Sequence, residues 1–526
     1  MKRKIVYFNG RFLTQADGLM INSMAVAHDE IVAVGNNLHR DRDWRGYSKI
    51  DLHGYTVVPG LVDAHTHFYL FVKSLAEVSL SGIDSLDKCL VKIETFAQSL
   101  PRRQWLIGAG LFVEGFARRI EPDRYMLDKV SGGRPAFIFY KDTHTAWVNT
   151  RALEVARIDA RTPDPPGGRI ERLPDGSPSG ILREAPAYLR LFRSVPPPSR
   201  RLIDRFHKKA LEVAYRKGVT GVHSFDSPDG FAYLSDLAAK NKIGLRINYY
   251  PPAAMMEHLE RTNTRYGTGT PFFRIAGVKI FADGSLGSQT ALCFHKYRGS
   301  EDNYGIEVTS PPEIARLIRR ASGLGMPCAI HAIGDRAIAN VLDAVEFSGR
   351  PGGRHRIEHL QLVRRKDLAR VKRLGIVASM QPSHCPADIA MVRRYWPDQS
   401  ANAYVFRTVL DKGIPLAFGS DAPIEPLDPI AGIAAAVRRA NPGSRDIFHP
   451  EQRIYATEGL QAYTVGSAYA CGQEDCRGRL LPGYPADFVV LDRDITRIAP
   501  ARIYDTTVLA TVLDGIVRYQ DPSLKW

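Results

Sequence analysis

Two histidines one residue apart, His65 and His67, end the segment VVPGLVDAHTHF (57–68). Side chains at positions i and i+2 point the same way only where the chain is extended, because strand side chains alternate between two faces. The segment is therefore predicted to be a buried strand that ends in two parallel imidazoles next to the carboxylate of Asp63. Such a pattern is typical of either a polar strand end or half of a metal site.

Four other polar side chains carried by short apolar segments could complete such a site. They are Lys279 in GVKIF, His331 in CAIHA, His359 in RIEHL and Asp421 in FGSDAP. Imidazole and carboxylate groups are ligands that Zn²⁺ and its first-row neighbours prefer. A lysine inside an apolar strand is costly to bury as an ammonium, whereas carboxylation by CO₂ would make it an anionic oxygen ligand able to bridge two cations. Any one of these residues alone is typical of ordinary structure, but together they indicate a metal centre.

The elements that must hold these side chains are predicted to be eight short strands, most of them followed by amphipathic helices. The strand segments lie at residues 57–67, 218–226, 244–250, 274–285, 326–335, 355–363, 375–384 and 414–423. Eight strand–helix units predict an α/β fold of the (β/α)₈ TIM-like barrel type, whose active site lies at the carboxyl ends of the strands. An open doubly wound sheet is the alternative.

The two ends of the chain differ from this middle region. Residues 1–58 and 471–526 alternate apolar and polar positions between turn signals, which predicts one small composite β-sandwich domain built from both termini. Residues 59–470 form the predicted barrel. Residues of about 69–217 are too many for a plain connection, so we expect an inserted subdomain after the first barrel strand.

Composition excludes several classes of protein. The chain of 526 residues carries a formal net charge of +15, but its Lys and Arg residues are spread in short clusters rather than in one stripe, so we expect no nucleic-acid function. No apolar run approaches the ~20 residues of a membrane span. The six cysteines are scattered, and the start of the chain lacks the apolar core of a signal peptide. We expect a cytoplasmic enzyme with a small-molecule substrate. A homodimer, the commonest symmetric assembly, is one oligomeric state open to it.

Several motifs resemble a known group of enzymes. VPGLVDAHTH, HAIGD, IEHLQ and GSDAP, in this order, are similar to the metal-binding motifs of the amidohydrolase superfamily. VKIFADGSLGSQTA, DTHTAWVNTRAL and PADFVVLDRD resemble the amidohydrolase-3 family, which includes N-substituted formamide deformylases. The resemblance covers nearly the whole chain, but it says little about substrate because the group is functionally varied.

The resemblance implies a set of ligands for one or two divalent cations, with zinc as the expected metal. His65 and His67 would bind the more buried cation with Asp421, and His331 and His359 would bind a second. A carboxylated Lys279 would bridge the two cations. An unmodified lysine would instead favour a single cation, with the ligands His65, His67, His331 and Asp421.

These ligands predict a metal-dependent hydrolase acting on a non-peptide C–N bond of an amide, N-formyl or N-acyl group. A metal-activated hydroxide would attack the carbonyl, and Asp421 would act as the general acid and base. A deaminase or cyclic-amide hydrolase on the same scaffold is the alternative, and an inactive scaffold protein is a further one.

Residues that could contact the substrate follow strands or lie in the insertion. Polar residues after a strand are also common turn formers, so each has a purely structural alternative. The candidates are His144, Trp147, Asp283, Ser288, Gln289 and His384.

Overall fold

The computed structural model describes residues 4–16, 19–101, 104–113, 116, 120–141, 144–349 and 353–525. Within these ranges no helix is long and apolar enough to cross a membrane. The chain divides into two compact units, the first made of residues 1–71 and 211–526 and the second of residues 72–210. Each unit is described by itself.

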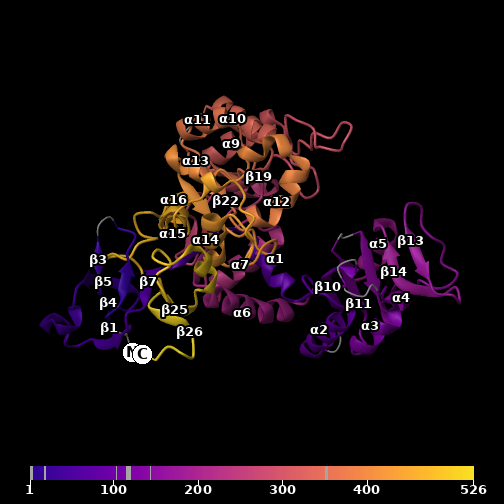
Figure 1. Ribbon diagram of the computed structural model, residues 1–526, viewed down its shortest axis with the longest axis horizontal. Coiled ribbons are helices and arrows are strands. Elements are labelled where there is room, and N and C mark those ends of the chain that lie inside the picture. Colours follow the sequence, from indigo (N-terminus) through magenta and orange to yellow (C-terminus); the bar gives the residue numbers. More distant parts are fainter. Residues whose placement is uncertain are drawn as a thin grey trace. The chain divides into compact units, whose positions relative to one another are not determined.

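The first unit contains two five-stranded sheets made mainly of parallel strands (Figure 1). Their orders are β17-β18-β16-β15-β8 and β19-β20-β21-β22-β23, and only the short edge strand β17 is antiparallel to its neighbour. The strands are β8 (Leu61–Thr66), β15 (Val219–Ser224), β16 (Arg246–Tyr249), β17 (Gly269–Thr270), β18 (Phe273–Ile275), β19 (Val278–Phe281), β20 (Cys328–Ala332), β21 (Arg356–His359), β22 (Val377–Met380) and β23 (Leu416–Phe418).

Isolated parallel bridges link the edges of these two sheets. Thr66 at the end of β8 bridges to Ala422 after β23, and Pro252 after β16 bridges to Lys279 in β19. In the described part of the chain, the ladders do not run continuously around one closed sheet. The segment predicted as one strand at 274–285 is split into β18 and β19, because β18 pairs with β16 whereas β19 pairs with β20. The mixed α/β class predicted from the sequence is confirmed.

The parallel strands are buried on both faces, which explains their nearly continuous apolar sequences. Amphipathic helices follow them and begin at recognisable signals. α14 begins after Asp428, whose carboxylate accepts a hydrogen bond from the Ala431 amide, and Pro429 occupies its first turn. The helices of the first unit are α1 (Phe68–Ser74) and α6 (Arg200–Arg216) at its borders, α7 (Pro228–Ala239), α8 (Met256–Arg261), α9 (Pro311–Gly323), α10 (Asp335–Phe347), α11 (Arg365–Arg373), α12 (His384–Tyr395), α13 (Phe406–Asp411), α14 (Pro429–Arg438), α15 (Ala456–Ala462) and α16 (Val465–Ala470).

Strands from both ends of the chain share one six-stranded sheet, of order β26-β25-β24-β7-β2-β3. β7 (Thr56–Pro59) leads directly into β8 and pairs antiparallel with β24 (Phe488–Leu491). The other four strands are β2 (Arg11–Leu13), β3 (Met20–Ile21), β25 (Val508–Leu513) and β26 (Ile516–Gln520). A four-stranded sheet, β5-β4-β1-β6, packs with it around an apolar core that includes Tyr7 and Phe488. Its strands are β1 (Lys4–Phe8), β4 (Ser23–Ala27), β5 (Glu30–Gly35) and β6 (Ser48–Asp51).

The second unit has its own sheet, of order β13-β14-β12-β11-β10-β9, and its own apolar core. The motif DTHTAWVNTRAL falls here, although its first two residues, 142 and 143, lie outside the described ranges. The elements are β9 (Val78–Ser79), α2 (Leu86–Ser99), β10 (Leu106–Leu111), α3 (Arg124–Val130), β11 (Ala136–Tyr140), β12 (Thr145–Val148), α4 (Thr150–Ala156), β13 (Arg169–Arg172), β14 (Pro178–Arg183) and α5 (Ala185–Phe192).

Gly419, which follows β23, lies so close to β8 that replacing it with alanine should destabilise the first unit. A Cβ at this position would come within 2.3 Å of the His65 amide nitrogen and 2.8 Å of Asp63 Oδ1. We expect Gly419→Ala to lower the free energy of unfolding by about 1–3 kcal/mol, the usual cost of overpacking. Urea denaturation followed by circular dichroism measures this change.

Gly323→Ala is the matched control, because a Cβ there meets nothing within 4 Å. It should leave stability unchanged or raise it by up to about 1 kcal/mol. Equal stabilities of the two variants would contradict the close approach of β8 to residue 419.

Candidate metal centre

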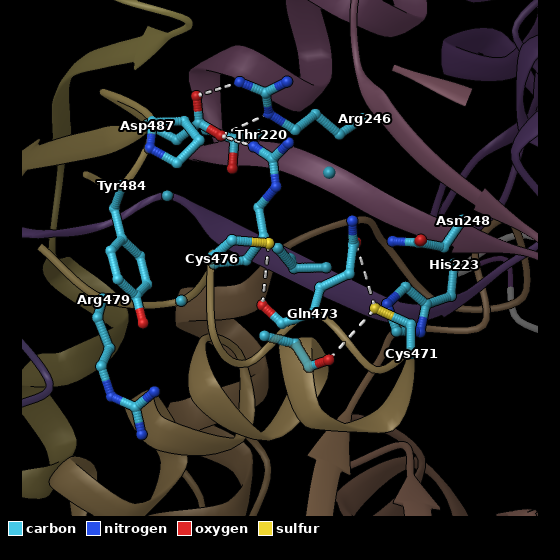
Figure 2. Close-up of a pocket in the computed structure, with 17 residues that line it drawn as sticks. Thr220, His223, Arg246, Asn248, Cys471, Gln473, Cys476, Arg479, Tyr484 and Asp487 are labelled. Atoms are coloured by element: carbon cyan, nitrogen blue, oxygen red, sulfur yellow. Dashed lines mark hydrogen bonds and ion pairs between the residues drawn. The ribbon is translucent and has the colours of Figure 1, made fainter. Parts of the chain in front are cut away.

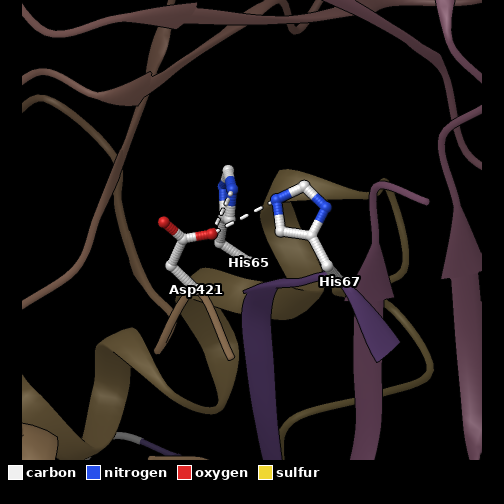
Figure 3. Close-up of side chains that lie close together, drawn as sticks. All are labelled: His65, His67 and Asp421. Carbon is white, nitrogen blue, oxygen red and sulfur yellow. Dashed lines mark ion pairs between the residues drawn. The ribbon is translucent and has the colours of Figure 1, made fainter. Parts of the chain in front are cut away.

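His65, His67 and Asp421 converge at one point, where the end of β8 meets the turn after β23 (Figure 3). His65 Nε2 lies 3.4 Å from Asp421 Oδ1, and His67 Nε2 lies 3.3 Å from the same oxygen. One potential ligand atom from each residue lies within 4.8 Å of the other two. This spacing is what a small cation bound between them requires.

Both imidazole rings are oriented by a hydrogen bond at the other ring nitrogen. His67 Nδ1 lies 2.9 Å from the carbonyl oxygen of Phe225, which can only accept, so Nδ1 carries the proton. His65 Nδ1 lies 2.5 Å from Oε2 of Glu358 in β21. The unprotonated Nε2 of each ring therefore faces Asp421, as is usual for histidines that bind metals.

A second group shares Asp421. His359, at the end of β21, and His384, in the first turn of α12, each bring a nitrogen within 4.8 Å of a carboxylate oxygen of Asp421 and of each other. His384 Nε2 lies 3.9 Å from Asp421 Oδ2, and the two rings are stacked with centroids 6.1 Å apart. Sequence reasoning suggested His384 only as a substrate contact, because nothing in the sequence indicated which way the first turn of α12 points.

His331 and Lys279 lie beside these groups without belonging to either. The His331 ring packs against His359 with centroids 4.5 Å apart, but its Nε2 donates a hydrogen bond to the Gly284 carbonyl oxygen at 2.9 Å. The Lys279 amine is buried 4.6 Å from the centre of the Phe225 ring. Burial lowers the pKa of this lysine to about 8.

The residues present fit a divalent cation. Within the described ranges, several buried ligand atoms of this region have no hydrogen-bond partner, which is costly unless another group satisfies them. They are His65 Nε2, Lys279 Nζ, His359 Nδ1, His384 Nε2 and Asp421 Oδ1. Neutral imidazoles and an ionised carboxylate are the forms that bind metals.

The electrostatics of the centre favour those same forms. Burial, reinforced by the neighbouring imidazoles of His331 and His65, holds the pKa of His359 well below its usual value. Burial alone would raise the pKa of Asp421, but the close approach of the His65 and His67 imidazoles holds that pKa well below its usual range. His359 is therefore neutral and Asp421 ionised at neutral pH.

Asp63 joins the two chain segments that carry the first group. Its Oδ1 accepts a hydrogen bond from the His65 amide at 3.1 Å, and both of its oxygens lie close to the Ser420 amide, at 2.9 and 3.1 Å. Complete burial raises the pKa of Asp63 to about 7. This carboxylate holds the backbone rather than contacting the ligand nitrogens.

The three candidate substrate residues after β19 lie in a tightly bonded loop. Both oxygens of the buried Asp283 side chain are used by backbone amides, those of Leu292, Ile333 and Gly334. Ser288 is exposed, and its hydroxyl is shared with those of Ser285 and Thr290. Gln289 has a positive φ of 54°, and its carbonyl oxygen accepts from Asn303. These contacts give Asp283 a role in shaping the loop.

The other two candidate substrate residues, His144 and Trp147, belong to the second unit. His144 is exposed, and its Nδ1 lies 3.0 Å from Glu184 Oε2. Trp147 is fully buried in the core of that unit, where its indole nitrogen donates to the Asp123 carbonyl oxygen at 2.8 Å. The described contacts of Trp147 are therefore those of a core residue.

A separate pocket of about 40 Å³ lies at the other ends of the strands, next to Gly60 and Thr220 (Figure 2). It holds the ion pair of Arg246 with Asp487, and none of the side chains that form the two Asp421 groups lines it. The His and Asp residues of the two groups are thus concentrated at the carboxyl ends of β8, β21, β22 and β23.

The fold is shared with metal-dependent hydrolases of known structure, and comparison with known proteins identifies the family. The chain belongs to the amidohydrolase family, whose model (Amidohydro_3) matches residues 49–519. This confirms the resemblance seen in the sequence motifs.

Individual relatives agree with this assignment. The YtcJ protein of Bacillus subtilis (strain 168) is 32% identical over 486 residues, which is 90% of each chain. The N-substituted formamide deformylase of Arthrobacter pascens is 30% identical over 492 residues, again 90% of each. The crystal structure of an uncharacterized metal-dependent hydrolase from Pyrococcus furiosus superimposes with a TM-score of 0.77 at 28% identity, covering 94% of this chain and all of that one.

The contacts of Asp283 predict that its side chain stabilises the folded protein. Asp283→Ala would leave three backbone amides without their acceptor, and each buried unsatisfied group costs about 1–3 kcal/mol. We expect a loss of at least about 3 kcal/mol in urea denaturation. Ser288→Ala, in the same loop but exposed, should change stability by less than about 0.5 kcal/mol. An Asp283→Ala variant with unchanged stability and a raised KM would instead support a substrate contact.

Proposed function

We propose that this protein is a metal-dependent hydrolase that cleaves a non-peptide C–N bond of an amide, N-formyl or N-acyl group. The observation that carries the proposal is the convergence of His65, His67 and Asp421 with their ligand atoms within 4.8 Å of one another. The N-substituted formamide deformylase among the relatives supports the choice of bond. We further infer that the two parallel sheets are halves of one (β/α)₈ barrel, an inference supported by the bridges Thr66–Ala422 and Pro252–Lys279.

His65, His67 and Asp421 would hold the first cation. A second cation has two possible ligand sets, both including His359. The family resemblance favours His331 and a carboxylated Lys279, and the lowered pKa of this lysine supports it, because the uncharged amine is the form that adds CO₂. The spacing of ligand atoms favours His384 and a bridging Asp421.

A bound cation would supply Lewis acidity, which lowers the pKa of water to roughly 7 and polarises a carbonyl group. The chain supplies the proton transfer. Asp421 is ionised, and its Oδ1 faces His65 and His67. Oδ2 is therefore the atom that would accept a proton from the attacking water and return it to the leaving nitrogen. His384 Nε2 lies 3.9 Å from Oδ2, too far for a direct hydrogen bond.

Elemental analysis of the purified protein tests the centre directly. Metal-replete protein should hold one or two equivalents of a divalent cation per chain, expected to be zinc. Less than about half an equivalent would contradict the ligand assignment, because four imidazoles and a carboxylate form a high-affinity set. If two cations bind, His331→Asn and His384→Asn separate the two ligand sets, since only the variant of a true ligand should reduce the content to one.

Replacing the proposed general base tests the mechanism. Asp421→Asn should lower kcat by at least about 10²–10⁴-fold, because an amide cannot accept the proton. The assay follows release of formate or acid from a panel of N-formyl and N-acyl amines, with cyclic imides and aminopurines included. Asp367→Asn, a buried aspartate paired with Arg364, is the control and should retain activity. Near wild-type turnover in Asp421→Asn would exclude this role, and ammonia release from the aminopurines would indicate a deaminase.

A further inference from the structure

A fully buried arginine, Arg356, lies next to the candidate metal centre. It lies in β21 two residues before Glu358, so both side chains are on the same face of the strand. Arg356 Nε lies 2.5 Å from Glu358 Oε1, and Nη2 lies 3.2 Å from Oε2. Neither side chain is exposed to solvent. The guanidinium thus holds both oxygens of the carboxylate that bonds to His65.

The guanidinium is itself fixed by groups from several strands. Nη2 donates to the Ala64 carbonyl oxygen and to Ser379 Oγ, each at 2.6 Å. Nη1 donates to His223 Nδ1 at 2.7 Å and lies 3.3 Å from the Tyr250 hydroxyl. These partners come from β8, β15, β22 and the residue that follows β16. With every N–H directed at an acceptor, the planar group has one available position.

This arrangement controls His65 in two ways. Glu358 Oε2, 2.5 Å from Nδ1, keeps the proton on that nitrogen and leaves Nε2 free to bind a cation. The bond from Arg356 to the Ala64 carbonyl fixes the backbone of β8 directly before His65. A carboxylate held behind a histidine ligand also makes that imidazole a stronger donor.

Glu358 does not act as a ligand in this arrangement. Both groups of ligand atoms found in the described residues exclude it, although it immediately precedes His359. Its oxygens are turned toward Arg356 and the far side of the His65 ring. Arg356 therefore keeps the negative charge of Glu358 close to the centre while preventing this carboxylate from acting as a ligand.

We propose that Arg356, through Glu358, is a positioning residue that sets the tautomer, orientation and cation affinity of His65. The inference rests on the proposed function, because it assumes that His65 binds a cation. It differs from an ordinary buried ion pair in its consequence, since loss of Arg356 should weaken cation binding beyond any loss of stability.

Arg246 provides a matched control. It lies in β16, and its side chain is 9% exposed. It forms a bidentate ion pair with Asp487, with Nε 2.6 Å from Oδ2 and Nη2 3.0 Å from Oδ1. Arg246→Met removes one of the two arginines paired with the buried Asp487, and Arg356→Met removes the guanidinium paired with the buried Glu358, so both should lower the thermal midpoint of the metal-free protein. Only Arg356 contacts the partner of a candidate ligand.

The test measures zinc affinity of the full chain by competition with a chromogenic chelator, and the absorption spectrum of the Co²⁺-substituted protein. Arg356→Met should weaken zinc binding about 10–100-fold and change the Co²⁺ bands, whereas Arg246→Met should leave both as in wild type. Because an unpaired buried charge can unfold a domain, the double variant Arg356→Met/Glu358→Leu removes both charges and should show the same loss of affinity.

Two results would overturn the inference. Zinc affinity of the Arg356→Met or double variant equal to that of Arg246→Met would show that the pair is only structural. Wild-type protein that binds no cation would overturn the proposed function and this inference together, so the two failures are distinguishable.

Discussion

The centre depends on the join between the end of β8 and the turn after β23. The Asp421 amide donates to the His65 carbonyl oxygen at 2.7 Å, and the His67 amide donates to the Ala422 carbonyl oxygen at 2.8 Å. Asp63 adds its bonds to the Ser420 amide. These contacts unite residues more than 350 positions apart in sequence, and they place a carboxylate opposite two imidazoles before any cation is bound. Such preformed ligand geometry reduces the entropy lost on binding.

Burial of charge is the second constraint, and the chain meets it in two different ways. Arg356 and Glu358 neutralise each other with complete hydrogen bonding, and although burial opposes it, Arg356 holds the pKa of Glu358 well below its usual range. Lys279 has aromatic rings near its amine, those of Phe225 and Phe281, and no hydrogen-bond partner among the described residues. An ion pair with complete hydrogen bonding is stable when buried. A buried amine without a hydrogen-bond partner is costly unless it is chemically modified or binds a ligand.

Much of this architecture could be predicted from the sequence, because apolar periodicity and strand ends depend on local residue types. The α/β class and the family followed from segments such as VVPGLVDAHTH and IEHLQ, and both are confirmed. The predicted convergence of His65, His67 and Asp421 depended on strand order, which recurring βα units indicate.

Other features were not predictable, because they depend on side-chain direction and long-range contact. His384 lies in a helical first turn, and its approach to Asp421 has no sequence signal. The role of Asp283 depends on three amides, that of Leu292 in the same loop and those of Ile333 and Gly334 after β20. The one available signal for the pair behind His65 was the i, i+2 spacing of Arg356 and Glu358 in RIEH, which gives two opposite charges on one face of a buried strand.

The pairing of β7 with β24 has a consequence for how the protein is made. Val57 and Val58, which precede the strand bearing His65, find their antiparallel partners only at Val490 and Val489. During synthesis, the edge of β7 that pairs with β24 stays unpaired until more than 400 further residues have emerged from the ribosome. Contacts of such sequence separation fold slowly and leave strand edges open to wrong partners. The strand that precedes His65 and His67 is thus fully paired only near the end of translation, and a truncated product would carry these histidines without the β24 edge beside β7.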